Sequence, residues 1–284
     1  MKNKIFLGED FINTTLSMAD LKTKMTLEIT KQYLMRAVMS GALVCFMYVC
    51  YYAIVSGFMQ IPAGTNGNMK YLGKFIGSFF FGVALVFIYF SKSELLTSNM
   101  MVVCVGRYYS RMSRNSFWRV LTLCYLGNFI GGLFVGVTMW ACTILSPEMI
   151  ALMDDSIAAK QGFITAGFSG HMDLFVRAIY CNFFINLGML IVYSGRVSSD
   201  FGRIMVMLSA VFIFVYLGLE HSVANTVLFT MGAFVTDVNP GLAIANVAYA
   251  LLGNFIGGGV MIGVYYAYIN DDTDWQRKHG AKED

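Results

Sequence analysis

Six apolar segments set the strongest limit on what this chain can fold into. They cover residues 33–58, 71–105, 117–145, 174–193, 204–235 and 242–268. A helix needs about 20 apolar residues to cross the hydrocarbon core of a bilayer. Polar residues interrupt the second and the fifth segment. The pattern predicts an all-α membrane protein with six transmembrane helices, in which helices 2 and 5 are broken.

Composition supports this class. Only 13% of the residues are charged and 57% are hydrophobic, with a mean hydropathy of +0.62. Soluble domains carry about 25% charged residues, which they need to cover their surface. The balance excludes water-soluble folds, nucleic-acid binders and secreted disulfide scaffolds. The six cysteines lie in apolar segments without metal-ligand spacing, so we expect no metal. No phosphate loop or dinucleotide fingerprint occurs, and we expect no cofactor.

The basic residues are distributed unevenly between the two predicted membrane faces. Fifteen of the 20 fall on the face that carries both termini, and Lys92 falls at membrane depth. The opposite face has four: Lys70, Lys74, Lys160 and Arg177. By the positive-inside rule, both termini are expected in the cytoplasm. We expect the protein to span the cytoplasmic (inner) membrane.

The same pattern divides the chain into three parts. We expect residues 1–30 to form a cytoplasmic segment, with an interfacial helix over 18–31 that leads into the first span. Residues 31–270 form the six-helix transmembrane domain. Residues 271–284 form a cytoplasmic tail.

The chain contains an internal repeat. The heptapeptide Leu-Gly-Asn-Phe-Ile-Gly-Gly occurs at 126–132 and again at 252–258, displaced by 126 positions. The same displacement relates two Glu-x-x-x-x-Asn motifs, at 94–99 and 220–225. Residues 35–38 resemble 176–179 at a displacement of 141. Two halves of three spans each, about 31–145 and 170–270, enter the membrane in opposite senses. Such inverted repeats are typical of channels and secondary transporters.

The two interruptions lie at matching places in the halves, at 91–99 and 220–222. Charged side chains and non-helical backbone are costly at membrane depth unless they face protein or water. We therefore expect two broken helices whose ends meet near the midplane. Their free backbone N–H groups carry partial positive charge, which suits a small anion.

Five polar residues in or near these segments are candidates for a functional or a structural role. His221, the only histidine in the membrane interior, is a candidate site residue; the alternative is a hydrogen bond to a neighbouring helix. A zinc site is not favoured, because no second interior histidine exists. Glu94 and Glu220 are expected to accept hydrogen bonds from loop backbone and hydroxyl groups, with proton carriage as the alternative. Asn128 and Asn254 are expected to join packed helices.

Several motifs resemble the formate/nitrite transporter family. They are Ser-Glu-Leu-Leu-Thr-Ser-Asn at 93–99, Leu-Glu-His-Ser-Val-Ala-Asn at 219–225, Cys-Asn at 181–182 and Ser-Gly-Arg at 194–196. The resemblance covers about 25–268. It implies an aquaporin-like fold, a homopentamer with one pore in each protomer, and a protein that is not an enzyme.

The resemblance also implies site residues. His221 would be the central pore histidine and Thr97 a loop threonine, with Asn182 nearby on the pathway. Loop support would come from Glu94, Asn99, Glu220 and Asn225. Two apolar constrictions, for which core packing is the alternative, would be formed by Phe81, Leu85, Leu95, Leu96 and Phe214.

Two lysines depart from the family pattern. Lys160 is the candidate vestibule lysine, but it lies 22 residues before Asn182, which predicts an insertion around 165–172. Lys92 stands where a small residue is usual, and its long stem is expected to reach the cytoplasmic vestibule.

These residues predict a pH-dependent channel or transporter for small monovalent weak-acid anions, with formate first and hydrosulfide or nitrite as the alternative. Its partners are the anion, a proton and the bilayer, and not nucleic acid. A proton from His221, or from water that it orders, would neutralise the anion; whether the ring donates the proton or only a hydrogen bond stays open. An aquaporin-type neutral-solute channel would need Asn-Pro-Ala motifs, which both breaks lack. A membrane hydrolase using Glu220 and His221 would lack a nucleophile.

Overall fold

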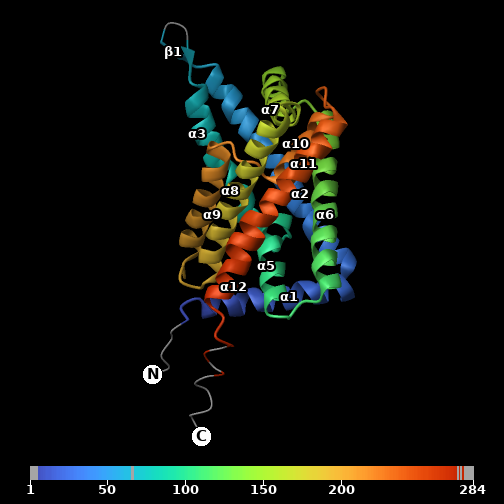
Figure 1. Ribbon diagram of the computed structural model, residues 1–284. Coiled ribbons are helices and arrows are strands. Elements are labelled where there is room, and N and C mark those ends of the chain that lie inside the picture. Colours follow the sequence, from blue (N-terminus) through green and yellow to red (C-terminus); the bar gives the residue numbers. More distant parts are fainter. Residues whose placement is uncertain (1–5, 65–66, 274, 276, 278–284) are drawn as a thin grey trace.

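The computed structural model describes residues 6–64, 67–273, 275 and 277, and it is mostly helical (Figure 1). Lys2, Lys4, Lys278, Lys282 and most of the predicted tail lie outside the described residues. The elements in chain order are α1 (Glu9–Glu28), α2 (Thr30–Met59), β1 (Pro62–Ala63), β2 (Gly67–Asn68), α3 (Lys70–Phe81), α4 (Val83–Phe90), α5 (Leu96–Tyr108), α6 (Arg114–Trp140), α7 (Pro147–Thr165), α8 (Gly167–Tyr193), α9 (Asp200–Tyr216), α10 (Ser222–Gly232), α11 (Pro240–Asn254), the π-helix η1 (Phe255–Val264) and α12 (Tyr265–Ile269).

Five helices among the described residues are long and apolar enough to cross a membrane. They are Thr30–Met59, Lys70–Phe90 (α3 with α4), Arg114–Trp140, Gly167–Tyr193 and Pro240–Ile269 (α11 through α12). They correspond to five of the six predicted segments. The remaining segment, 204–235, is divided between α9, of 17 residues, and α10, of 11 residues. Neither helix alone has the length of a span.

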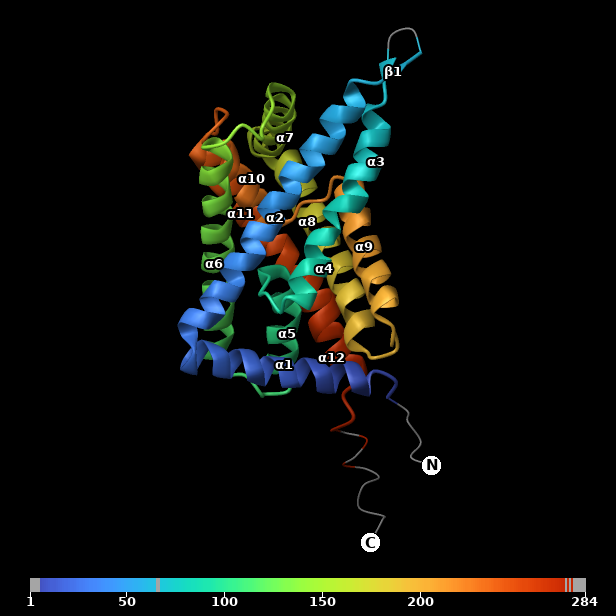
Figure 2. The same ribbon diagram turned by 180° about the vertical axis from the view of Figure 1, so that it is seen from behind.

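The long helices stand side by side, and α1 lies across one end of them (Figures 1 and 2). We call this the α1 end. The opposite end, which carries α7 and the β1–β2 hairpin, is the α7 end. The Gly8 N–H donates to Asn270 Oδ1 over 2.7 Å, so the first and last described segments meet at the α1 end.

The two halves pack their helices in the same way, through glycine. A Cβ on Gly131 of α6 would lie 1.9 Å from the Val38 carbonyl oxygen of α2. A Cβ on Gly257 of η1 would lie 2.0 Å from the Ile179 carbonyl oxygen of α8. The two glycines are 126 positions apart and the two carbonyls 141 apart. Only glycine permits these close backbone approaches. Helix α6 therefore packs on α2 in the same way as η1 packs on α8.

Two predicted segments differ from the structure. The helix expected over 18–31 is α1, which begins at Glu9 and ends at Glu28. The predicted insertion around 165–172 is not a loop, because all of these residues except Ala166 are helical, in α7 or α8. The helix α7 was not predicted. Its start carries a recognisable signal, since Ser146 Oγ accepts the Met149 N–H and Pro147 opens the helix.

Both polar interruptions have the same backbone turn. Helix α4 ends at Phe90 and α5 begins at Leu96; helix α9 ends at Tyr216 and α10 begins at Ser222. The Ser93 N–H donates to the Ile88 carbonyl over 3.0 Å, and the Leu219 N–H donates to the Phe214 carbonyl over 2.8 Å. Such bonds close a helix whose next residue is left-handed.

Candidate functional site

His221 is held at the start of α10 by two hydrogen bonds. Its Nδ1 accepts the Ala224 N–H over 3.0 Å, and its Nε2 lies 3.0 Å from Thr97 Oγ1. The ring stacks on Phe214, with centroids 5.6 Å apart. Because a backbone donor occupies Nδ1, the neutral ring carries its proton on Nε2 and donates a hydrogen bond from it to Thr97 Oγ1. The hydroxyl hydrogen of Thr97 stays free to donate.

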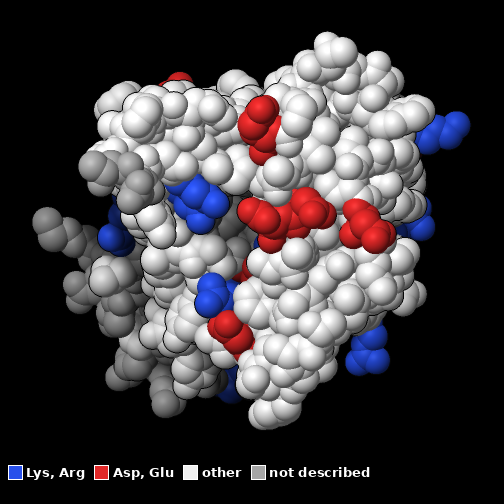
Figure 3. Space-filling view, turned by 90° about the horizontal axis from the view of Figure 1, so that it is seen from above, with Lys and Arg blue, Asp and Glu red and all other residues white. Residues whose placement is uncertain are grey.

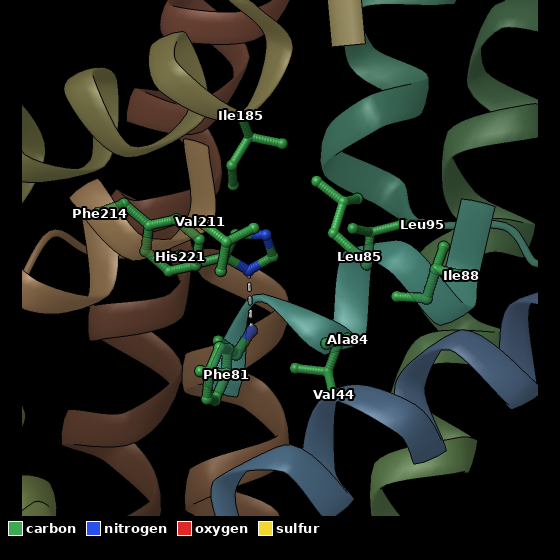
Figure 4. A pocket seen from close by; sticks show the side chains of 11 residues that line it. Val44, Phe81, Ala84, Leu85, Ile88, Leu95, Ile185, Val211, Phe214 and His221 are labelled. Carbon is green, nitrogen blue, oxygen red and sulfur yellow. Dashed lines mark hydrogen bonds between the residues drawn. The ribbon is translucent and has the colours of Figure 1, made fainter. Parts of the chain in front are cut away.

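The imidazole faces a small cavity (Figure 4). The cavity volume is about 20 Å³, which is room for one water-sized molecule. Apart from His221, every side chain that lines it is apolar. The lining residues are Val44, Phe81, Ala84, Leu85, Ile88, Leu95, Ile185, Val211, Phe214, His221 and Ala224.

Most of this lining consists of residue pairs that the internal repeat relates. The pairs, at displacements of 126 or 141, are Leu85 with Val211, Ile88 with Phe214, Leu95 with His221, and Val44 with Ile185. The cavity therefore lies where the two halves meet. The pairs match in polarity except at Leu95 and His221, where one half supplies an alkyl group and the other an imidazole.

Asn128 anchors the first polar loop. Its Oδ1 accepts the Leu96 N–H over 3.0 Å, and its Nδ2 donates to the carbonyls of Glu94 (2.9 Å) and Ala37 (2.8 Å). Asn254 makes the same three contacts in the second half. Its partners are the Ser222 N–H (2.8 Å) and the carbonyls of Glu220 (2.9 Å) and Ala178 (2.7 Å). Both asparagines thus join helices, as predicted, and in addition fix the loops beside the cavity.

Glu94 is buried against a lysine of α1. Its Oε2 accepts hydrogen bonds from Lys22 Nζ over 2.5 Å and from Asn99 Nδ2 over 2.9 Å. The expectation that loop backbone and hydroxyl groups bind this carboxylate is wrong. Its donors are an ammonium and an amide, because α1 packs against α5 and brings Lys22 to the loop.

Glu220 has the equivalent surroundings at the α7 end. Lys160 Nζ donates to both carboxylate oxygens, over 2.9 and 2.8 Å, and Asn225 Nδ2 donates to Oε2 over 2.5 Å. The expectation that backbone and hydroxyl groups donate to this carboxylate is wrong here too. Asn246 Nδ2 donates to the Lys160 carbonyl over 2.9 Å and holds α7 in place. The unusual spacing of Lys160 is thus accommodated by a separate helix.

A larger cavity of about 620 Å³ opens at the α1 end. Its lining includes Lys22, Glu94 and Lys92, whose side chain is exposed. Three apolar residues line both this cavity and the small one, and so separate them. They are Leu85, Ile88 and Leu95.

The predicted site residues divide into two groups. Five of them meet at the small cavity: Phe81, Leu85, Leu95, Phe214 and His221. The others lie around it, in supporting positions. Leu96 is buried next to Asn128, and Asn182 Nδ2 donates to the carbonyls of Thr97 (3.1 Å) and Asn254 (2.7 Å).

Sequence reasoning missed Val44, Ala84, Ile88, Ile185, Val211, Ala224 and Lys22. The apolar ones carry no signal of their own, because core packing and cavity lining use the same residue types. The repeat could have identified two of them. Val211 is displaced by 126 from Leu85, and Ile88 by the same number from Phe214. Within the described ranges, no group of three or more His, Cys, Asp or Glu side chains gathers as a metal site would require.

Known sequences that are similar to this chain belong to the family that its motifs resemble. A sequence model of the family described as "Formate/nitrite transporter" matches residues 9–268. The formate channel FocA of Haemophilus influenzae is 26% identical, with 83% of this chain and 85% of the relative covered. The nitrite transporter NirC of Escherichia coli is 28% identical over 66% of this chain and 68% of the relative.

Solved structures show the same fold. An "FNT family ion channel" superposes with a TM-score of 0.78 at 21% identity, covering 92% of this chain and 98% of that one. A "pentameric formate channel with formate bound" gives a TM-score of 0.70 at 20% identity, covering 85% and 98%.

Proposed function

The chain belongs to the formate/nitrite transporter family, and on that premise we propose that it is a pH-dependent channel or transporter for small monovalent anions of weak acids. Formate is the first candidate, because relatives are named formate channels and one structural neighbour is described with formate bound. Nitrite, which a relative's name includes, and hydrosulfide are the alternatives.

We also propose how the chain is arranged in the membrane. Residues 31–270 form six spans in two inverted repeats with an aquaporin-like fold, and the segments around α3–α5 and α9–α10 are broken spans. Both flanking segments, 1–30 and 271–284, are cytoplasmic, and the membrane is the inner membrane. The equivalent glycine contacts and loop turns of the two halves support the repeat. The description of a neighbour as pentameric supports a homopentamer.

One observation carries the function: His221 is the only polar side chain among those that line the small apolar cavity. An anion that entered this cavity would lose its water, and burying an uncompensated charge costs several kcal/mol. Its neutral conjugate acid avoids that cost. We therefore propose that the substrate crosses as the protonated acid, and that His221, whose ring Thr97 holds in place, replaces part of its lost hydration.

The two hydrogen bonds of His221 support the role of hydrogen-bond donor over that of proton donor. The neutral ring has its proton on Nε2, and losing it would leave an imidazolate. Charging the ring would require a proton on Nδ1, which would displace the Ala224 N–H. The proton that neutralises the anion therefore comes from solution at the mouth of the pore. Asn182 and Asn186 Nδ2 both donate to the Thr97 carbonyl over 3.1 Å and position the threonine.

A substrate panel tests this function. Purified protein in proteoliposomes is assayed by counterflow with labelled formate, nitrite, hydrosulfide and glycerol, at external pH from about 5 to 8. Formate uptake is expected to exceed that of protein-free liposomes and to rise as the pH falls, because more substrate can cross as the acid. Glycerol uptake without anion uptake would support the neutral-solute alternative. No anion uptake at any pH would overturn the proposal.

A further inference from the structure

The two ends of the pathway differ in charge although their backbones are equivalent. We propose that the cavity at the α1 end contains an anion-binding site formed by Arg36 and Lys92, which holds a hydrated small monovalent anion before it reaches the apolar cavity. The identity of that anion rests on the proposed function; the existence of the site does not.

The cavity has an excess of positive charge. Lys22, Arg36 and Lys92 line it together with a single carboxylate, that of Glu94. Lys22 and Glu94 form a buried ion pair with each other. Neither Arg36 nor Lys92 forms an ion pair with any acidic side chain in the described part of the chain. Two positive charges therefore remain in a space of about 620 Å³, which is large enough for an anion with its water.

The second half contains the same arginine contact in neutralised form. Arg36 Nη1 donates to the Lys92 carbonyl over 2.8 Å, and Arg177 Nη1 donates to the Gly218 carbonyl over 3.2 Å. Arg177 also donates to Asp173 Oδ1 over 2.7 Å and is thereby paired. The position equivalent to Asp173 in the first half, 141 residues earlier, is Gln32. An amide cannot neutralise Arg36.

Lys92 is the second asymmetric position. Its φ of 56° matches the φ of 65° at Gly218, its counterpart 126 residues later. Glycine adopts this left-handed conformation freely, whereas a residue with a Cβ is strained in it. The turn thus needs no side chain, and at Lys92 it carries a cationic one. The ammonium lies 4.9 Å from the Tyr89 ring centroid, which keeps it at the cavity wall.

The α7 end carries acidic side chains that the α1-end cavity does not have. Helix α7 presents Glu148, Asp154 and Asp155, all exposed. Figure 3 shows acidic side chains beside the hollow in the middle of this face. Attraction of an anion is therefore expected in the α1-end cavity, whose lining holds three cations and one carboxylate. Like-signed charges that line a concave site raise the local concentration of counter-ions by about tenfold or more.

Equilibrium binding of [¹³C]formate, followed by NMR line broadening in detergent solution at low ionic strength, tests the site without requiring transport. The Arg36→Gln/Lys92→Gln variant is expected to bind formate about tenfold more weakly than the parent, and each single variant about threefold. In 1 M salt, where charges are screened beyond about 3 Å, the difference is expected to shrink. Lys92→Gly is included because glycine adopts this φ without strain. Weaker formate binding by this variant therefore reports the lost charge and not a disturbed backbone.

Lys31→Gln is the matched control, because it removes a positive charge at the same end from an exposed residue outside the cavity lining. Its binding is expected to equal that of the parent. The site is overturned if the double variant binds as well as the parent, if Lys31→Gln is weakened equally, or if the parent does not bind. If binding changes as expected but the parent transports no anion, the proposed function fails and the site stands.

Discussion

Replacement of His221 by phenylalanine is expected to abolish pH-dependent anion flux, lowering formate uptake into proteoliposomes by about 10- to 100-fold, because a buried polar group left without its hydrogen bond costs about 1–3 kcal/mol. A phenyl ring fills the same place against Phe214 but offers no N–H to Thr97 or to the substrate. The cavity around it stays apolar, so nothing replaces the water that the substrate leaves behind. Initial rates of labelled formate uptake across pH 5 to 8 measure the effect.

His171 provides the matched control for this substitution. It lies on α8, outside the cavity lining, and stacks on Tyr249 with centroids 4.8 Å apart, a contact that phenylalanine can retain. His171→Phe is expected to leave the flux within about twofold of the parent. Unchanged flux in His221→Phe at every pH would contradict the proposed mechanism.

Replacement of Lys160 by methionine is expected to destabilise the protein by about 3–5 kcal/mol, because it leaves the carboxylate of Glu220 buried without its cation. The Glu220 side chain is 4% exposed and that of Lys160 14%, so water screens the pair little. Thermal unfolding of the purified protein in detergent measures the loss. The double variant Lys160→Met/Glu220→Gln is expected to recover most of it, since no uncompensated charge remains.

Lys24→Met is the control for the pair. Lys24 lies 3.9 Å from Glu28, and both side chains are more than 60% exposed. Such surface pairs contribute about 0–1 kcal/mol, so this variant is expected to unfold close to the parent. A Lys160→Met protein as stable as Lys24→Met would show that the Lys160–Glu220 contact does not stabilise the fold.

The sequence predicted the helical membrane class and the family, and both predictions are confirmed. Bilayer-length apolar runs follow from one physical requirement, so they can be recognised without any knowledge of packing. Cavity lining could be predicted only in part. Phe81 and Leu85 were expected from the resemblance, whereas Val44 and Ile185 could not be told from core residues.

The partners of Glu94 and Glu220 could not be predicted from the sequence, for a different reason. Each lies next to a lysine that is 72 or 60 residues away and belongs to a helix outside the six predicted segments. The helix α1 was expected to rest at the membrane interface, and α7 was not expected at all. Without their placement, Lys22 and Lys160 could be counted as charges of one face or the other but not paired.

Passage of the substrate through the His221 cavity as a neutral acid can be tested directly. The most direct measurement follows formate uptake and internal acidification together in proteoliposomes, with the membrane potential set by potassium and valinomycin and with protein-free liposomes subtracted. If the neutral acid crosses, one proton enters with each formate and the rate does not change with the potential. A bare anion would sense about 2.3 kcal/mol per 100 mV. A rate that follows the potential, without acidification, would show that the anion crosses in its charged form.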